Sequence, residues 1–217
     1  MKHVVIGIPG ETWSAHTAMA YGDLIARFGA MHPGEAVRTQ AAYATGTTLC
    51  SNRQDLADQA VAAGATHLLF IDTDMVFPGE SLNRLLAHEK PIVGCNYTSR
   101  RLPLRTTAAT MNGKRMVSLG KEGLEKAAHI GLGMALIETK VFTSMPKPHF
   151  IVGWWQNTET GGSNYISEDV SFCRKARAAG FDIWVDHDLS LEIGHVGEMI
   201  FTHEHLMPGD AGHPEQP

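Results

Sequence analysis

Residues 68–80, LLFIDTDMVFPGE, join a short apolar run to two aspartates and a Phe-Pro-Gly turn. An uninterrupted apolar run of this length is typical of a strand buried at the centre of a parallel sheet, where both faces are covered. The pattern therefore predicts a strand over residues 67–71, with Asp72 and Asp74 just beyond its carboxyl end. Parallel α/β sheets bind ligands at that edge, so these two carboxylates are the first candidate site residues.

Strand and helix patterns alternate on both sides of this segment. Strands are predicted over residues 4–8, 91–97, 133–138 and 181–186, and helices over residues 17–29, 51–63, 78–88 and 168–179. Residues 98–128 have a basic composition rich in Thr, Gly and Asn, which indicates an irregular or hairpin insertion, and residues 153–165 are predicted to form a long loop. The alternation predicts an α/β fold with a mostly parallel central sheet flanked by helices.

Two helix predictions include finer detail. The first helix should bury one face made of Ala18, Tyr21, Leu24, Ile25 and Phe28, which recur at helical spacing. Ser51 is the predicted N-cap of the second helix, and Gly64 is its predicted stop.

Length and composition limit the classes to which the protein can belong. A chain of 217 residues suits one domain, predicted over residues 1–205, followed by a loose polar tail over residues 206–217. Eighteen Lys and Arg against 23 Asp and Glu give a net charge of −5, which argues against a general nucleic-acid coat protein.

The chain contains no apolar stretch approaching the roughly 18–20 residues that a transmembrane helix needs. Its first residues read as a strand rather than a secretory signal, so a cytoplasmic location is expected. Cys50, Cys95 and Cys173 are odd in number and form no CxxC pair, which favours reduced thiols packed in the core.

The spacing of Asp72 and Asp74 favours a cation. In an extended segment, side chains at i and i+2 project to the same side, and two convergent carboxylates repel each other unless a positive charge lies between them. A hard divalent cation with oxygen ligands is the usual solution. A DxD tripeptide alone is unspecific, since one aspartate often caps a turn while the other is solvated.

The second half of the chain supplies further candidates. Glu168 and Asp169 begin a helix, although Ser167 as a cap and the positive helix end would explain such acids without a ligand. His195 lies in LEIGHVG, where the nearby glycines leave its imidazole room to approach a ligand. A lone histidine is more often packed or solvated than a metal ligand.

Together these segments resemble the GT-A nucleotide-sugar glycosyltransferases, most closely the family 2 type and its short bacterial and phage relatives. The similar segments are VVIGIPG as the first strand, SNRQDLADQA as the "ARN" helix, FIDTDMVFP as the DxD strand, IGLGMALIETKVF as the "GxGxxLI" strand, SEDVSFCRKARAAG as the "ED" helix, and a terminal GH. Their order covers residues 2–197. The resemblance implies a single, Rossmann-like GT-A domain that transfers a sugar from a UDP- or GDP-sugar to an acceptor hydroxyl.

The resemblance also implies roles for individual residues. Asp72, Asp74 and His195 would bind Mn²⁺ or Mg²⁺, with Asp72 contacting the ribose or a metal-bound water. Asn52 and Arg53 would lie near the nucleotide, Arg53 as a charge partner of Asp72 or of the diphosphate, and Arg100 or Arg101 could contact phosphate. Trp154, Trp155 and Glu168 would bind the acceptor, and Asp169 would be the catalytic base of an inverting reaction.

Departures from the family pattern leave several points open. The QxxRW motif of processive relatives is absent, so polymer synthesis and export is not expected. Ser14, His16 and Thr17 occupy positions where many relatives place an acidic residue against the nucleobase, so the identity of the donor's nucleobase stays open. The acceptor is also open, whether a glycan, a lipid-linked sugar, a protein, a small molecule or a modified DNA base, and so is a homo-oligomeric state.

Two other functions are compatible with parts of the sequence. His187, Asp188, His195, His203 and His205 are enough ligands for a dinuclear metal hydrolase, although that hypothesis does not account for the DxD strand or the ED helix. A sugar- or nucleotide-binding module without turnover would keep the fold but not the reaction.

Overall fold

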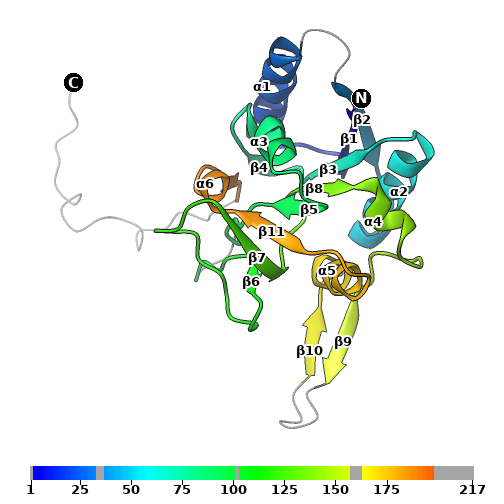
Figure 1. The fold of residues 1–217 in the computed structure, drawn as a ribbon, viewed down its shortest axis with the longest axis vertical. Helices are drawn as coiled ribbons and strands as arrows, with labels where there is room; N and C mark the ends of the chain where they lie inside the picture. The colour runs from blue at the N-terminus through cyan, green and yellow to red at the C-terminus, as the bar shows by residue number, and fades with distance from the viewer. Residues whose placement is uncertain (1, 33–36, 101–102, 157–162, 198–217) are drawn as a thin grey trace, which may run out of the picture.

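An eight-stranded mixed sheet forms the centre of the protein, in the order β2-β1-β3-β8-β5-β11-β7-β6 (Figure 1). Its strands are β1 (Lys2–Pro9), β2 (Val37–Ala44), β3 (His67–Ile71), β5 (Ile92–Gly94), β6 (Ala109–Thr110), β7 (Leu124–His129), β8 (Met134–Glu138) and β11 (Ile183–Asp186). β7 and β8 run opposite to the other strands, which share one direction. The predicted α/β class with a mostly parallel central sheet is confirmed.

This computed structural model describes residues 2–32, 37–100, 103–156 and 163–197. The predicted tail over residues 206–217 lies outside the described residues, as do Arg101, His203 and His205. No helix within the described ranges is long and apolar enough to cross a membrane.

Within the described ranges, six helices accompany the sheet: α1 (Ala15–Met31), α2 (Leu49–Ala62), α3 (Ser81–Ala87), α4 (Thr139–Thr143), α5 (Glu168–Ala178) and α6 (His187–Ser190). They divide between its two faces, because one core cluster contains residues of α2, α4 and α5, and the other contains residues of α1, α3 and α6. Side chains of a strand point alternately to opposite faces. Accordingly, Leu68 and Phe70 of β3 belong to the first cluster, whereas Leu69 and Ile71 belong to the second.

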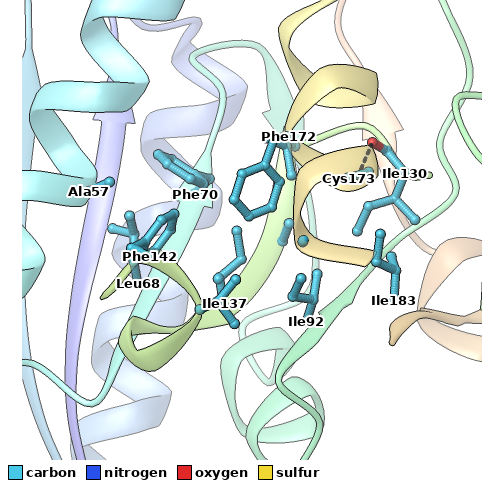
Figure 2. Close-up of a cluster of buried hydrophobic side chains, with 14 of the residues drawn as sticks. Ala57, Leu68, Phe70, Ile92, Ile130, Ile137, Phe142, Phe172, Cys173 and Ile183 are labelled. Carbon is cyan, nitrogen blue, oxygen red and sulfur yellow. Dashed lines mark hydrogen bonds between the residues drawn. The ribbon is translucent and has the colours of Figure 1, made fainter. Parts of the chain in front are cut away.

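Figure 2 shows the cluster that lies under α2, α4 and α5. Phe150 stacks on Phe172 with ring centroids 5.1 Å apart, and its edge meets Phe70 at 5.8 Å. The thiol of Cys173 donates a long hydrogen bond of 3.8 Å to the carbonyl oxygen of Ile130, drawn as a dashed line. Cys95 and Cys173 are buried free thiols, as predicted, whereas Cys50 is half-buried.

Two helix details differ from the predictions. Of the predicted face of α1, Leu24 and Phe28 are buried, Tyr21 and Ile25 are partly buried against the same core cluster, and Ala18 is exposed. Thr17 and Ala20 complete the buried face. α2 begins earlier than predicted, because Thr48 rather than Ser51 is its N-cap and accepts a hydrogen bond of 3.2 Å from the Ser51 amide. The predicted stop at Gly64 is confirmed by its left-handed backbone, with φ of 64°.

The predicted loop over residues 153–165 is instead an antiparallel hairpin of β9 (Gly153–Gln156) and β10 (Ser163–Ile166). Aromatic residues on both strands favour this pairing, because they pack across a two-stranded ribbon. Figure 1 shows the hairpin projecting from the body of the protein beside α5. A second small pairing joins β4 (Met75–Val76) to β12 (Gly194–His195).

Candidate functional site

A pocket of about 580 Å³ opens where the parallel strands β1 and β3 end. Its lining residues come from the β1–α1 loop, the β3–β4 turn, the segment after β5 and the residues that follow β12: Thr12, Trp13, Ser14, Thr73, Asp74, Arg100, Val196 and Gly197. This is the edge of the sheet at which α/β proteins bind ligands. Residues far apart in sequence therefore meet at the predicted place.

The loop after β1 is fastened to the turn after β3. The Ser14 amide donates a hydrogen bond of 2.9 Å to the Thr73 carbonyl, and the Ser14 hydroxyl caps α1 by accepting from the Thr17 amide at 3.0 Å. A Cβ added to Gly10 would lie 2.9 Å from the Thr73 side chain, so this approach needs a glycine. These contacts fix the floor of the pocket.

The two aspartates of the DxD segment have separate partners, and the segment is a turn rather than the extended stretch that was expected. The chain turns at this point, because the Met75 amide donates a hydrogen bond of 3.3 Å to the Asp72 carbonyl. Asp72 faces Arg53, with Nη2–Oδ1 and Nη2–Oδ2 distances of 2.9 and 3.2 Å. Asp74 instead faces the pocket.

Asp74 lies against two cationic groups. Its Oδ2 is 2.6 Å from Arg100 Nη1, and its Oδ1 is 3.3 Å from His195 Nε2. The pairing of β12 with β4 brings His195 to this position, because His195 is aligned with Met75 and the Val196 amide donates 2.8 Å to the Asp74 carbonyl. The predicted proximity of His195 to the DxD segment is thus observed for Asp74.

These contacts change the protonation of both partners. Burial would raise the pKa of Asp74, but the hydrogen bond and charge of His195, together with the charge of Arg100, lower it below its usual range. Burial would lower the pKa of His195, but its hydrogen bonds with Asp74 and the Thr98 carbonyl raise it. Without a bound cation, the pair is therefore stabilised as carboxylate and imidazolium.

The Asp74–His195 pair also fits a divalent cation. His195 Nδ1 lies 2.8 Å from the Thr98 carbonyl, and a carbonyl accepts only from N–H. A neutral ring would then direct the lone pair of Nε2 toward Asp74 Oδ1, and a cation would bind both atoms. Among the described residues, no three His, Cys, Asp or Glu side chains form a metal cluster, so further ligands would have to come from a substrate or water.

Arg53 connects the DxD strand to the ED helix. Its side chain is only 2 % exposed and contacts Asp72, Glu168 at 3.5 Å and the Leu132 carbonyl at 3.3 Å. Burial opposes the guanidinium charge, but the two carboxylates outweigh it and the pKa of Arg53 is raised. Burial also raises the pKa of Glu168, while Arg53 acts in the opposite direction. The expected pairing of Arg53 with Asp72 is confirmed.

Tyr97, which was not among the residues predicted for the site, lies near both Asp72 and His195. Its hydroxyl accepts a hydrogen bond of 2.9 Å from the Gly133 amide, and the edge of its ring meets His195 with centroids 5.3 Å apart. A Cβ on Gly131 or Gly133 would lie 2.4 or 2.7 Å from that hydroxyl. The GLG sequence before β8 was the available signal, since closely spaced glycines often admit a bulky neighbour.

Glu168 and Asp169 lie in the first turn of α5, as predicted, but Ser167 does not cap this helix with its side chain. Instead, the Ser167 hydroxyl donates to Asp169 Oδ1, which also accepts from the Val170 amide at 2.7 Å. The charge of Asp169 contributes to the pKa of Tyr97 and of Arg53. Asp169 is therefore within electrostatic reach of the network that begins at Asp72.

A second pocket of about 500 Å³ adjoins the first and shares Trp13 with it. Its walls include three aromatic side chains, Trp13, Tyr21 and Tyr43, and the edge of Tyr21 meets the Trp13 ring with centroids 5.1 Å apart. Flat aromatic walls suit a planar ligand. The sequence did not predict these three residues as part of a site, because single aromatic residues in a loop, a helix and a strand form no local pattern.

The remaining candidates are distributed around this centre. Asn52 is buried on α2, and its Oδ1 has no hydrogen-bond partner among the described residues. Trp154 is 73 % exposed on β9 and meets Tyr165 of β10 edge-on at 6.0 Å. The backbone of Trp155 lies in β9, and its side chain is outside the described part of the structure.

The described histidines of the hydrolase hypothesis have separate partners. His187 is buried between Ser118 at 2.9 Å and Glu125 at 3.0 Å, whereas His195 faces Asp74. Asp188 accepts a hydrogen bond from the Gly123 amide at 2.8 Å. These contacts explain His187 and Asp188 as structural residues.

No family model matches the sequence, and no curated protein matches it. Among solved structures, the chain is similar to A197 from STIV, with a TM-score of 0.54 and 12 % identity over 94 % of this chain and 100 % of that one. It is also similar to the inositol-1-phosphate CTP transferase from T. maritima, with a TM-score of 0.42 and 11 % identity over 88 % of this chain and 96 % of the other. The likeness to A197 shows a shared α/β fold.

Proposed function

We propose that the protein is a metal-dependent glycosyltransferase that moves a sugar from a nucleotide-diphosphate sugar to an acceptor hydroxyl with inversion. The observation that supports this most strongly is the pair of adjoining pockets on either side of Trp13. One pocket carries the charged side chains of Asp74 and Arg100, and the other is walled by aromatic rings. A nucleotide diphosphate has the same two parts, a charged group and a planar base.

In this proposal the base occupies the aromatic pocket, with Trp13 and Tyr43 offering faces or edges to the ring. The diphosphate occupies the pocket at the ends of β1 and β3, where Arg100 supplies positive charge. Asp72 would contact the ribose from its position against Arg53. Asn52 is proposed to orient this side of the site through its buried amide.

Asp74 and His195 would hold the divalent cation, and an imidazole ligand favours Mn²⁺ over Mg²⁺. When bound, the cation supplies Lewis-acid stabilisation of the charge on the leaving diphosphate. The chain itself orients these two metal-binding side chains, because the Thr98 carbonyl holds the His195 ring and the β3–β4 turn places Asp74 in the wall of the pocket.

Asp169 is the proposed base. An acceptor hydroxyl becomes a good nucleophile when a base within hydrogen-bond reach removes its proton, which is typically worth about 10² to 10⁴ in rate. Both hydrogen bonds to Asp169 use Oδ1, and we expect Oδ2 to accept the proton. Trp154 on the neighbouring hairpin would bind the acceptor, and Glu168 would position the helix start through Arg53.

Incubation with Mn²⁺ and radiolabelled UDP- and GDP-sugars tests this proposal. We expect one donor to bind and to be hydrolysed slowly to free sugar and the nucleoside diphosphate. EDTA should abolish both effects, and Mn²⁺ should restore them. Asp74→Asn should weaken metal-dependent binding more than Asp72→Asn does, and His195→Ala should lower Mn²⁺ affinity by about one to two orders of magnitude.

Asp58→Asn is the matched control, because Asp58 also forms an ion pair, with Lys147 at 2.7 Å, but on the exposed face of α2. It should bind donor and Mn²⁺ as the unaltered protein does. Release of sugar phosphate and nucleoside monophosphate would instead support a metal hydrolase, and tight binding without any turnover would support a binding module. Equal donor binding by Asp74→Asn and Asp58→Asn would refute the assignment of Asp74.

A further inference from the structure

Arg100 occupies the position from which a cation would approach Asp74. Its Nη1 lies 2.6 Å from Asp74 Oδ2, and its side chain is 52 % exposed. The stem of Arg100 lies close to the backbone of Gly197, where an added Cβ would be 3.3 Å from Arg100 Cβ. The base of this side chain is therefore packed, while its charged end lies in the pocket, where Asp74 is its partner.

The three positive groups at Asp74 compete with one another. The carboxylate already contacts Arg100 and His195, and a divalent cation bound there would repel a guanidinium on the other oxygen. The Arg100 end of this ion pair is exposed to water, which weakens the pair, so a divalent cation can displace the guanidinium. Cation binding at Asp74 would therefore release the guanidinium.

The released guanidinium stays within the pocket. Arg100 lines it together with Thr12, Ser14 and Thr73, and among the lining side chains of the described pocket it is the only Lys or Arg. A guanidinium can donate two parallel N–H groups to phosphate oxygens, and the same N–H groups bind a carboxylate. Asp74 and a phosphate group are thus alternative partners for the same donor atoms.

We propose that Arg100 exchanges partners, from Asp74 in the ligand-free protein to the phosphate oxygens of a nucleotide diphosphate when a cation binds Asp74. This inference rests on the proposed function. It makes Arg100 a coupling residue between two ligands, since each ligand favours the arrangement that the other needs. Mn²⁺ and diphosphate then bind with positive cooperativity that depends on Arg100.

The variant Arg100→Gln tests the exchange, with Arg105→Gln as the matched control. Arg105 is an exposed basic residue of the same segment and is not among the residues that line the pocket. Titration with Mn²⁺ alone, followed by electron paramagnetic resonance, should show that Arg100→Gln binds Mn²⁺ about two- to fivefold more tightly, because the competing cation is gone. Arg105→Gln should bind Mn²⁺ as the unaltered protein does.

Calorimetry with UDP, GDP or pyrophosphate in saturating Mn²⁺ gives the second readout. Arg100→Gln should bind the diphosphate about tenfold or more weakly, since a charge-assisted hydrogen bond is lost, and Arg100→Lys should lie between the two. Opposite effects on Mn²⁺ and on diphosphate are the result expected of an exchange. A fall in both affinities, or no change in either, would overturn it.

Failure of the proposed function is distinguishable from failure of the exchange. If the unaltered protein binds Mn²⁺ and UDP or GDP, but Arg100→Gln behaves like Arg105→Gln, only the exchange is wrong. If no nucleotide diphosphate binds, the proposed function is wrong. Pyrophosphate and Mn²⁺ then still decide the exchange, and absence of their coupled binding would overturn it as well.

Discussion

Arg53 Nη2 on α2 lies 2.9 Å from Asp72 Oδ1 at the end of β3. The arginine of this ion pair is buried, whereas the aspartate is partly exposed. The same guanidinium reaches Glu168 at the start of α5 and stacks over Phe70 with 5.2 Å from its central carbon to the ring centroid. One side chain therefore joins the strand before the DxD turn to the helix that carries Asp169.

Arg53→Met should destabilise the protein by about 2–4 kcal/mol, because removing one partner leaves two carboxylates and a carbonyl without their donor. The loss is moderated by the Asp72 side chain, which is 23 % exposed. Arg27→Met, which breaks the exposed Arg27–Asp23 pair, should cost much less, because solvent screens an ion pair on the surface. Urea unfolding measures both, and similar losses would show that the Arg53 network contributes little.

Gly133→Ala should lower both stability and Mn²⁺ affinity. The new Cβ would lie 2.7 Å from the Tyr97 hydroxyl and 3.0 Å from Asp72 Oδ2, so the ring that packs on His195 must move. Gly22→Ala is the control, because nothing lies within 4 Å of its added Cβ in the exposed part of α1, and it should stabilise by about 0.5–1 kcal/mol. Unchanged Mn²⁺ affinity in Gly133→Ala would show that Tyr97 does not position His195.

Asp169→Asn should lose transfer by about 10² to 10⁴ while retaining Mn²⁺-dependent donor binding, since an amide cannot accept the proton. Asp182→Asn is the control, because Asp182 pairs with Lys126 on the surface at 2.6 Å, and it should transfer normally. Rates with an identified acceptor and calorimetry with the donor provide the two readouts. NMR of the new glycosidic bond should show inversion, and retention of the donor configuration would contradict the proposed base.

Trp154→Ala should raise the KM for the acceptor while leaving slow donor hydrolysis unchanged, because the exposed indole lies on the hairpin and outside both pockets. An aromatic face packs against the apolar face of a sugar ring. Met19→Ala removes a comparably exposed apolar side chain from α1 and should have no effect. An unchanged KM in Trp154→Ala would exclude the hairpin as an acceptor surface.

Three partly buried histidines should make stability fall as pH decreases below about 6.5, the ordinary pKa of histidine, whereas His195, whose pKa is raised, contributes in the opposite direction. Burial lowers the pKa of His67, His129 and His149, so the unfolded chain binds protons that the folded chain does not. Stability is then lost between the unfolded pKa and each lower folded pKa. Urea unfolding at pH 7.5 and 5.5 measures this loss, which should be smaller in His129→Gln; an equal loss in that variant would show that His129 does not contribute.

Local patterns were sufficient for much of the fold. The apolar run over residues 67–71 and the helical spacing of Leu24 and Phe28 predicted elements that the structure contains, because the period of burial is set by the geometry of each element. The positions of Asp72, Asp169 and His195 at element ends were likewise predictable. The hairpin of β9 and β10 was not, since Gly and Asn within residues 153–165 read as loop signals.

The chain sequence by itself determined the buried strand over residues 67–71 and the residue types that gather at the carboxyl edge of the sheet. The family resemblance implied that Arg53 could neutralise Asp72. The sequence patterns did not predict β2, whose Ala42 and Ala44 are buried. Only the tertiary structure decided which partner each group has. At the turn over residues 72–75, Asp72 contacts Arg53 and Asp74 lines the pocket, and the β4–β12 pairing brings His195 to Asp74. Such contacts join residues far apart in sequence, as His195 and Thr98 are, and depend on packing that no local period encodes.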